Sequence, residues 1–217
     1  MRILNLYACL GGNRFKWDEV ADIDVTAVEL DPEAARLYQE RFHNDTVVVA
    51  DAHQYLLDHY KEFDFIWSSP PCPTHSRARY WSSSNYDTTT EPVYPDMKLY
   101  QEILFLQHYY KTGKWCVENV IPYYEPLIVA QKRGRHLYWT NFLLPTSLGD
   151  RRFDVGSAKQ ELKGLCEFHD YDFNKYKGEQ SVLKMARNLV DYEAGRTILE
   201  IALNIHKEND IKQQRLF

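Results

Sequence analysis

The chain has 217 residues, a formal net charge of −5, and 44% hydrophobic, 14% aromatic and 26% charged residues. This length suits one domain with a sizeable core, and the composition is that of a globular protein rather than a disordered or fibrous one. No apolar run approaches transmembrane length and the first residues follow a strand pattern, so we expect a cytoplasmic protein with no membrane partner and no signal peptide. The negative charge excludes a surface coated with basic residues, although a local basic patch would still allow nucleic-acid binding.

Strand patterns alternate with helical patterns through the first half of the chain. The predicted strands are Ile3–Tyr7, Val25–Glu29, Val47–Ala50, Phe63–Trp67 and Trp115–Glu118. A helix is predicted after Asp31, a good N-cap followed by Pro32, and a second one over Asp96–Tyr110. Strands that alternate with helices predict an α/β fold, Rossmann-like, with a mostly parallel sheet and helices on both faces.

The rest of the pattern predicts the domain organisation. Residues 1–142 read as a catalytic and cofactor-binding core, and residues 143–180 as a small insert without clear periodicity. Residues 181–206 read as a helical part that completes the core and is broken near Gly195, and residues 207–217 as a polar tail. The loop 73–95 is rich in Ser, Thr, Tyr and Pro, and loops of that length are usually functional or disordered.

The first strand runs into a glycine turn at Gly11-Gly12, where backbone can approach a ligand closely. Glu29 ends the next strand, where an acidic side chain can hold ribose hydroxyls, and Asp51 follows the third, where it can accept from an adenine amino group. These residues predict a nucleotide-containing cofactor at the carboxyl ends of adjacent strands. The pattern leaves both a nicotinamide cofactor and S-adenosylmethionine open, although the missing Gly-x-Gly-x-x-Gly counts against a dehydrogenase.

A thiol and a carboxylate also stand at strand ends. Cys72 follows the run Phe63–Trp67 across a rigid Pro-Pro turn, and Glu118 lies near the end of a later strand. C5 of cytosine is a poor nucleophile, but a thiolate that adds at C6, helped by an acid at N3, turns the ring into an enamine that can attack a methyl donor. Either residue alone would be unspecific, whereas the two together predict this chemistry. The four cysteines lack metal-ligand spacing, so we expect reduced thiols and no metal.

These motifs, in this order, resemble those of the cytosine-C5 methyltransferase family over most of the chain. Tyr7-Ala-Cys-Leu-Gly-Gly12 is similar to the Phe-x-Gly-x-Gly-Gly cofactor loop, and Glu29 and Asp51 match the next two cofactor contacts. The further matches are the nucleophile motif Ser69–Cys72, the glutamate motif Glu118–Val120, the Gln-x-Arg-x-Arg motif Gln131–Arg135 and, loosely, a last motif at Asn188–Val190.

The resemblance implies S-adenosylmethionine as methyl donor, S-adenosylhomocysteine as product, and DNA as partner, with the target base flipped out of the duplex. It implies cofactor contacts at Tyr7, Ala8, Gly11, Gly12, Glu29, Asp51, Pro70 and Asn188. Cys72 would be the nucleophile and Glu118 the acid at N3, in a protonated or shared-proton form. Arg133 or Arg135 would contact the base or order the catalytic loop. Nucleic-acid contacts are expected at Gln131, Arg77 and Arg79. For Arg77 and Arg79 the sequence is equally compatible with a solvated loop that makes no specific contacts.

The chain departs from the family pattern in several places. Cys9 stands where the family has its first glycine, so the backbone there is expected to take positive φ less freely. Pro73 and His75 replace the residues that usually follow the nucleophile, and Asp191-Tyr-Glu replaces prolines after Asn188-Leu-Val. The segment where the family has its target-recognition domain is short here. We therefore expect a relaxed specificity, a short target sequence, or recognition by a separate chain.

Three alternatives stay open. An amino methyltransferase acting on N4 of cytosine or N6 of adenine also uses a Ser-Pro-Pro motif, but it needs no thiol. An inactive nucleic-acid-binding scaffold is suggested by Cys9 and by the short recognition segment, and RNA is a possible substrate within the family. The short chain is compatible with a compact enzyme of a phage or of a bacterial restriction-modification system.

Overall fold

The computed structural model describes residues 1–77, 93–149, 151 and 158–205. Its strands are β1 (Arg2–Leu6), β2 (Asp24–Glu29), β3 (Thr46–Val49), β4 (Phe65–Ser68), β5 (Lys114–Val120), β6 (Gln131–Arg133) and β7 (His136–Thr140). Its α-helices are α1 (Pro32–Arg41), α2 (Ala52–His59), α4 (Lys98–Tyr109), α5 (Ala158–His169), α6 (Val182–Asn188) and α7 (Tyr192–Ala202), with 3-10 turns η1 (Trp17–Glu19), η2 (Tyr60–Glu62) and η3 (Phe173–Lys175). Within the described ranges, none of the helices combines the length and apolar character that crossing a membrane requires.

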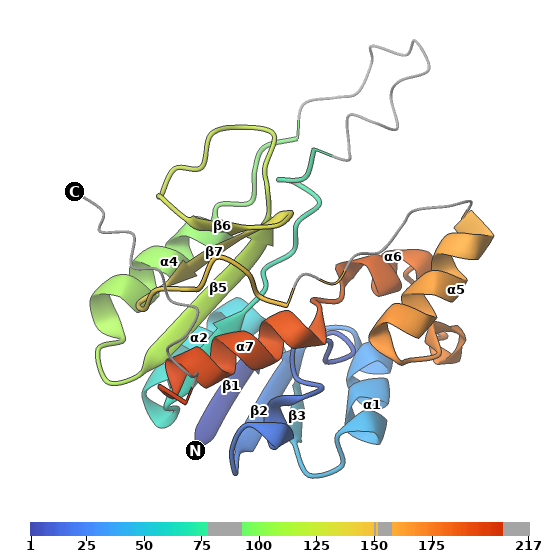
Figure 1. The fold of residues 1–217 in the computed structure, drawn as a ribbon, viewed down its shortest axis with the longest axis horizontal. Helices are drawn as coiled ribbons and strands as arrows, with labels where there is room; N and C mark the ends of the chain where they lie inside the picture. The colour runs from blue at the N-terminus through green and yellow to red at the C-terminus, as the bar shows by residue number, and fades with distance from the viewer. Residues whose placement is uncertain (78–92, 150, 152–157, 206–217) are drawn as a thin grey trace.

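The strands form one seven-stranded sheet in the order β3-β2-β1-β4-β5-β7-β6 (Figure 1). The first five strands in this order run parallel to one another, whereas β7 runs antiparallel to β5 and β6 antiparallel to β7. This mixed sheet is typical of the S-adenosylmethionine-dependent methyltransferase fold, so the predicted α/β class is confirmed. The parallel strands bring their carboxyl ends to one edge, which is where open α/β sheets bind ligands.

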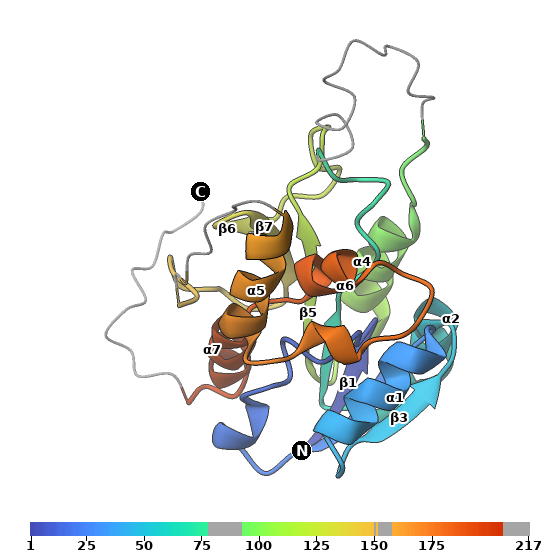
Figure 2. The same cartoon turned by 90° about the vertical axis from the view of Figure 1, so that its right-hand side faces the viewer.

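Helices cover both faces of the sheet (Figure 2). Buried side chains of β1, such as Leu4 and Leu6, share one core cluster with Leu56 of α2 and Ile103 of α4. On the opposite face, Ile3 packs in a cluster with residues of α7. Because alternate residues of β1 serve the two faces, the strand is buried at every position after Arg2.

The predicted strands and the two predicted helices lie within about two residues of the observed elements, an offset normal for element ends. The sequence did not predict α2, α5 or the β6–β7 hairpin. The C-terminal helical part is interrupted at residues 189–191, between α6 and α7, and not near Gly195 as predicted. Gly195 lies inside α7, at a point where the helix packs on the backbone of Asn13. A Cβ at position 195 would stand 2.1 Å from the Asn13 carbonyl oxygen, so this contact requires glycine.

The described part of the predicted insert packs onto the core. Leu165 of α5 and Phe173 of η3 belong to a buried cluster that also contains Leu37 of α1 and Met185 of α6. The Tyr176 hydroxyl donates to the Asp31 carboxylate at the N-terminus of α1, and the Lys177 N–H donates to Glu33 at 3.2 Å. These contacts place the described part of the insert beside α1, at the end of the sheet where β2 stops.

Candidate functional site

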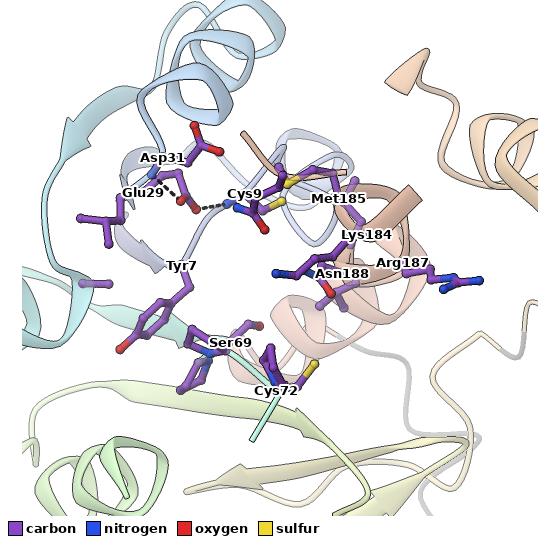
Figure 3. A pocket seen from close by; sticks show the side chains of 18 of the residues that line it. Tyr7, Cys9, Glu29, Asp31, Ser69, Cys72, Lys184, Met185, Arg187 and Asn188 are labelled. Carbon is purple, nitrogen blue, oxygen red and sulfur yellow. Dashed lines mark hydrogen bonds between the residues drawn. The ribbon is translucent and has the colours of Figure 1, made fainter. Parts of the chain in front are cut away.

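A pocket of about 700 Å³ lies at the carboxyl ends of the parallel strands. One of its ends is formed by residues that follow β1, β2 and β3, and the other by residues that follow β4 and by β5. Helix α6 and the chain after it form the facing wall (Figure 3). Of the predicted site residues, the pocket brings together Tyr7, Glu29, Asp51, Pro70, Cys72, Glu118 and Asn188.

The turn after β1 has an unusual backbone. Tyr7 and Cys9 have φ of 56° and 48°, and Gly11 has φ of 70°. The sequence suggested that Cys9 would adopt positive φ less freely than glycine, yet it takes this conformation, which costs a non-glycine residue about 1–2 kcal/mol. The Cys9 N–H donates to Glu29 Oε2 at 2.8 Å, which holds the strained backbone in place.

Glu29 anchors the end of the pocket that is formed after β1, β2 and β3. Its second oxygen, Oε1, accepts from the Asp31 N–H at 2.9 Å, so one carboxylate holds two backbone segments of the pocket wall (Figure 3). Burial raises the pKa of Glu29, and the N–H groups of Asp31 and Cys9 act against that rise. Carboxylate oxygens can accept more than one hydrogen bond each, so Glu29 still has capacity for hydroxyl groups of a ligand.

Gly11, Gly12 and Ala8 do not line the pocket but shape its floor. A Cβ at Gly12 would lie 2.5 Å from the Val190 carbonyl oxygen, and one at Gly11 would lie 2.3 Å from the Phe42 ring. The glycine turn therefore brings β1 close to the chain between α6 and α7. Of the three, only Gly11 has positive φ, where its lack of a side chain also removes backbone strain.

Asp51 has a structural role that its sequence position did not indicate. Its side chain accepts from the Gln54 N–H at 3.0 Å as the N-cap of α2, and its other oxygen lies 3.2 Å from Lys98 Nζ. These contacts lower the pKa of Asp51, the backbone bond from Gln54 being the largest cause. The side chain stays exposed at the pocket edge.

A buried carboxylate that the sequence motifs do not include supports this end of the pocket. Glu102 of α4 is fully buried and accepts from the Tyr7 hydroxyl at 2.6 Å and from the Ser68 hydroxyl at 2.6 Å. His53 Nδ1 lies 3.0 Å from the same carboxylate. Glu102 therefore ties the ends of β1 and β4 to α4. A glutamate within an amphipathic helix gives no sequence signal for such a role.

Cys72 lies at the other end of the pocket, half-buried, after the turn that follows β4. The Asn119 side chain donates to the Pro70 carbonyl oxygen at 2.9 Å, which fixes the Pro-Pro turn against β5. Burial raises the pKa of the Cys72 thiol, the nearby Glu118 carboxylate adds to the rise, and Lys184 acts against it. The thiol therefore needs the positive charge of Lys184, or that of a ligand, to form a thiolate near neutral pH.

Lys184 projects from α6 across the pocket from Cys72 (Figure 3). The described part of the chain offers it no carboxylate within 4 Å, whereas Arg187 one turn later is paired with Glu161 at 2.6 Å and points away. Lys184 is thus a cation of this pocket without an acidic partner among the described residues. Sequence reasoning missed it because only the fold brings residue 184 opposite residue 72.

The arginines of the predicted Gln-x-Arg-x-Arg motif do not line the pocket. Arg133 donates to the carbonyl oxygens of Lys132, Leu144 and Pro145, and Gln131 bonds to Thr140, Phe142 and Leu144. Arg135 is exposed at the β6–β7 turn. In the structure Arg133 and Gln131 therefore hold the chain after β7, and contacts of Arg135 or Gln131 to a nucleic acid stay predictions.

Two of the predicted nucleic-acid contacts, Arg77 and Arg79, lie in the loop that follows Cys72. Arg77 is exposed and its Nε donates to the Pro122 carbonyl oxygen at 2.9 Å, and its contact with a nucleic acid stays a prediction. Arg79 lies outside the described residues. The predicted reduced recognition segment, over residues 143–180, lines the pocket at Gly178–Gln180 beside Asp31. A separate recognition chain stays a prediction.

We expect the alkylation rate of Cys72 to report the charges around it. Glu118→Gln removes a negative charge and should lower the thiol pKa, which gives faster reaction with iodoacetamide at pH 8. Lys184→Gln removes the opposing positive charge and should raise that pKa and slow the reaction. Mass spectrometry of the Cys72 peptide across pH 7–10 measures both. If the alkylation rate of Cys72 depended on pH in the same way in Lys184→Gln and in the protein without a substitution, Lys184 would not act on the thiol.

Comparisons with known proteins agree with the motifs. Residues 1–105 match the family model described as C-5 cytosine-specific DNA methylase, and this match confirms over those residues the resemblance that the motifs indicate. The matched part includes the β1 turn, Glu29, Asp51 and Cys72, but it ends before Glu118. No curated protein matches the chain.

Several solved structures are similar to part of the chain. They include a DNMT2 variant of Spodoptera frugiperda (24% identity, 55% of this chain, 35% of that one, TM-score 0.40). A protein described as a prophage-encoded DNA modification methyltransferase of E. coli is 17% identical over 56% of this chain and 32% of that one, with a TM-score of 0.39. The Entamoeba histolytica methyltransferase EhMeth is 14% identical over 55% of this chain and 38% of that one, with a TM-score of 0.36. The matched part of this chain corresponds to about a third of the length of these structures.

Proposed function

We propose that this protein transfers a methyl group from S-adenosylmethionine to C5 of cytosine in DNA. The observation that carries the proposal is that Cys72 and Glu118 line one end of a pocket whose other end is lined by Glu29 and Asp51. A thiol and a carboxylate at the same end of one pocket match the needs of cytosine activation, and the family match of residues 1–105 supports the same reaction.

The residues at the other end fit S-adenosylmethionine. Glu29 and Asp51 present carboxylate oxygens at the ends of adjacent strands, the arrangement that suits ribose hydroxyls and an adenine amino group. Tyr7, Pro70 and Asn188 line the pocket between this end and Cys72. Gly11 and Gly12 lie beneath it, where a Cβ would clash with neighbouring residues. Bound there, S-adenosylmethionine supplies an electrophilic methyl group.

The chain's own residues activate the cytosine. The base must first leave the duplex stack, at a cost of about a few kcal/mol. The Cys72 thiolate, favoured by Lys184, adds to C6 while Glu118 gives a proton to N3, and C5 becomes nucleophilic. After C5 has taken the methyl group, the C5 proton passes to water and N3 returns its proton to Glu118, which re-forms the C5–C6 double bond and expels the Cys72 thiolate. We assign the cation beside the thiol to Lys184 and not to Arg133, because Arg133 is held by backbone carbonyl oxygens away from the pocket.

Covalent trapping tests this proposal. With S-adenosylmethionine and duplex DNA that contains 5-fluorocytosine, the protein should form a stable adduct, since fluorine at C5 cannot leave as the proton does. Mass spectrometry should place the adduct on Cys72. An amino methyltransferase would methylate the duplex without an adduct. An adduct on RNA alone would redirect the proposal to RNA, and loss of S-adenosylmethionine binding would favour an inactive scaffold.

A further inference from the structure

We propose that His136 is a positioning residue for Glu118: it holds one carboxylate oxygen so that the other faces the cytosine ring. The inference rests on the proposed function and deepens it, because it names a residue that the motifs do not include. His136 lines the pocket together with Glu118 and Cys72, and it reaches the site from β7, a strand that the sequence did not predict.

The pairing of β5 with β7 sets this contact. Glu118 lies opposite Tyr138, and Val120 lies opposite His136. Residues directly opposite in an antiparallel pair share a face of the sheet, as do residues two apart on one strand. Glu118 and His136 therefore project from the same face as diagonal neighbours, and His136 Nδ1 lies 3.4 Å from Glu118 Oε1. Their side chains are only 17% and 8% exposed, so water competes little for the contact.

The surroundings of the ring favour a neutral donor. Nδ1 of His136 lies 3.4 Å from Glu118 Oε1 and 3.5 Å from the Tyr138 hydroxyl, and both oxygens can accept. This arrangement favours the tautomer with the proton on Nδ1. Burial lowers the pKa of His136; among the charged groups around it, Glu118 and Asp191 act to raise the pKa and Arg135 acts to lower it. A neutral imidazole can orient the Glu118 carboxyl group without adding a full positive charge beside Cys72.

The contact matters because a glutamate has three side-chain torsions, and the last one rotates broadly. One fixed oxygen limits that rotation and directs the other oxygen toward N3 of a base above Cys72. The distance of 3.4 Å between His136 Nδ1 and Glu118 Oε1 exceeds that of a good hydrogen bond, but contacts of this kind commonly tighten when the reacting complex forms. Misplacement of a catalytic group by about 1 Å can cost a factor of about 100 in rate.

Two amide substitutions test the inference with nearly the same chemistry. In His136→Asn the side-chain NH2 can occupy the place of Nδ1, whereas in His136→Gln it reaches the place of Nε2. We expect kcat for C5 methylation to fall about 10- to 100-fold in H136Q, with KM for S-adenosylmethionine within about twofold of the original value. H136N should exceed H136Q by at least about tenfold. Equal kcat values for the two variants would overturn the inference.

A double-mutant cycle separates positioning from general packing. In single-turnover experiments, H136Q should slow the unmodified protein strongly but should slow Glu118→Gln by less than about twofold, because the effect passes through Glu118. The same loss in both backgrounds would mean that His136 acts elsewhere, and this outcome would overturn the inference. A protein without Cys72-dependent methylation would overturn the proposed function as well, whereas an active protein insensitive at His136 would overturn the inference alone.

Discussion

Replacement of Cys72 by alanine is expected to reduce methyl transfer to C5 of cytosine by a factor on the order of 10³ or more, as removal of a catalytic nucleophile typically does. The physical reason is that C5 becomes nucleophilic only when a thiolate has added at C6. Transfer of labelled methyl from S-adenosylmethionine to duplex DNA, followed by digestion to nucleosides, measures both the rate and the methylated position. Binding of S-adenosylmethionine should change little, because Cys72 lies at the opposite end of the pocket from Glu29 and Asp51.

Cys166→Ala is the matched control for this experiment. Cys166 is also a free, partly buried thiol, but it lies on α5 and does not line the pocket. Its loss should leave methylation near the original rate. If Cys72→Ala kept full activity with label on an exocyclic nitrogen, the reaction would be amino methylation. If it kept full activity with label at C5, the covalent mechanism would be wrong.

The central part of the fold could be predicted from the sequence because its signals are local. Each parallel strand carries several apolar residues within a short run, and α1 has a strong start signal in Asp31-Pro32, where the Asp31 carboxylate accepts from the Glu33 and Ala34 N–H groups. Open α/β topology then places the residues after these strands at one edge. For that reason the amino-acid sequence alone suffices to predict that Tyr7, Glu29 and Cys72 meet in one pocket.

The other half of the site depends on contacts between distant segments. His136 meets Glu118 only through the register of the β5–β7 pair, and Lys184 meets Cys72 only through the packing of α6. The motifs indicated Arg133 as a source of positive charge, but its guanidinium is instead held by carbonyl oxygens of its own chain segment and of the chain after β7. A motif gives the type and spacing of residues, but it does not show what each side chain contacts.

The turn that forms the cofactor floor depends on a buried ion pair, and its disruption should be the most destabilising polar substitution we predict. Arg14 follows the turn directly and is 3% exposed. Its Nε and one amino group donate to the two oxygens of the buried Asp45 at 2.9 Å, and Tyr38 donates to the same carboxylate at 2.8 Å. We expect Arg14→Leu to lower the free energy of unfolding by about 3–5 kcal/mol, because Asp45 would stay buried without its counter-charge.

Chemical denaturation followed by circular dichroism measures this loss. Arg36→Leu is the control: Arg36 also pairs with two carboxylates, but it is exposed on α1, so its removal should leave the midpoint of unfolding nearly unchanged. Asp45→Asn added to Arg14→Leu should restore much of the stability, since the unpaired charge is then gone while Tyr38 keeps an acceptor. A double variant as unstable as Arg14→Leu would show that lost packing, and not the buried charge, causes the effect.

Because Arg14 follows Gly11-Gly12-Asn13, we also expect the single variant to bind S-adenosylmethionine more weakly at temperatures where it remains folded. This result would link the stability of the ion pair to the end of the pocket at which we propose that S-adenosylmethionine binds.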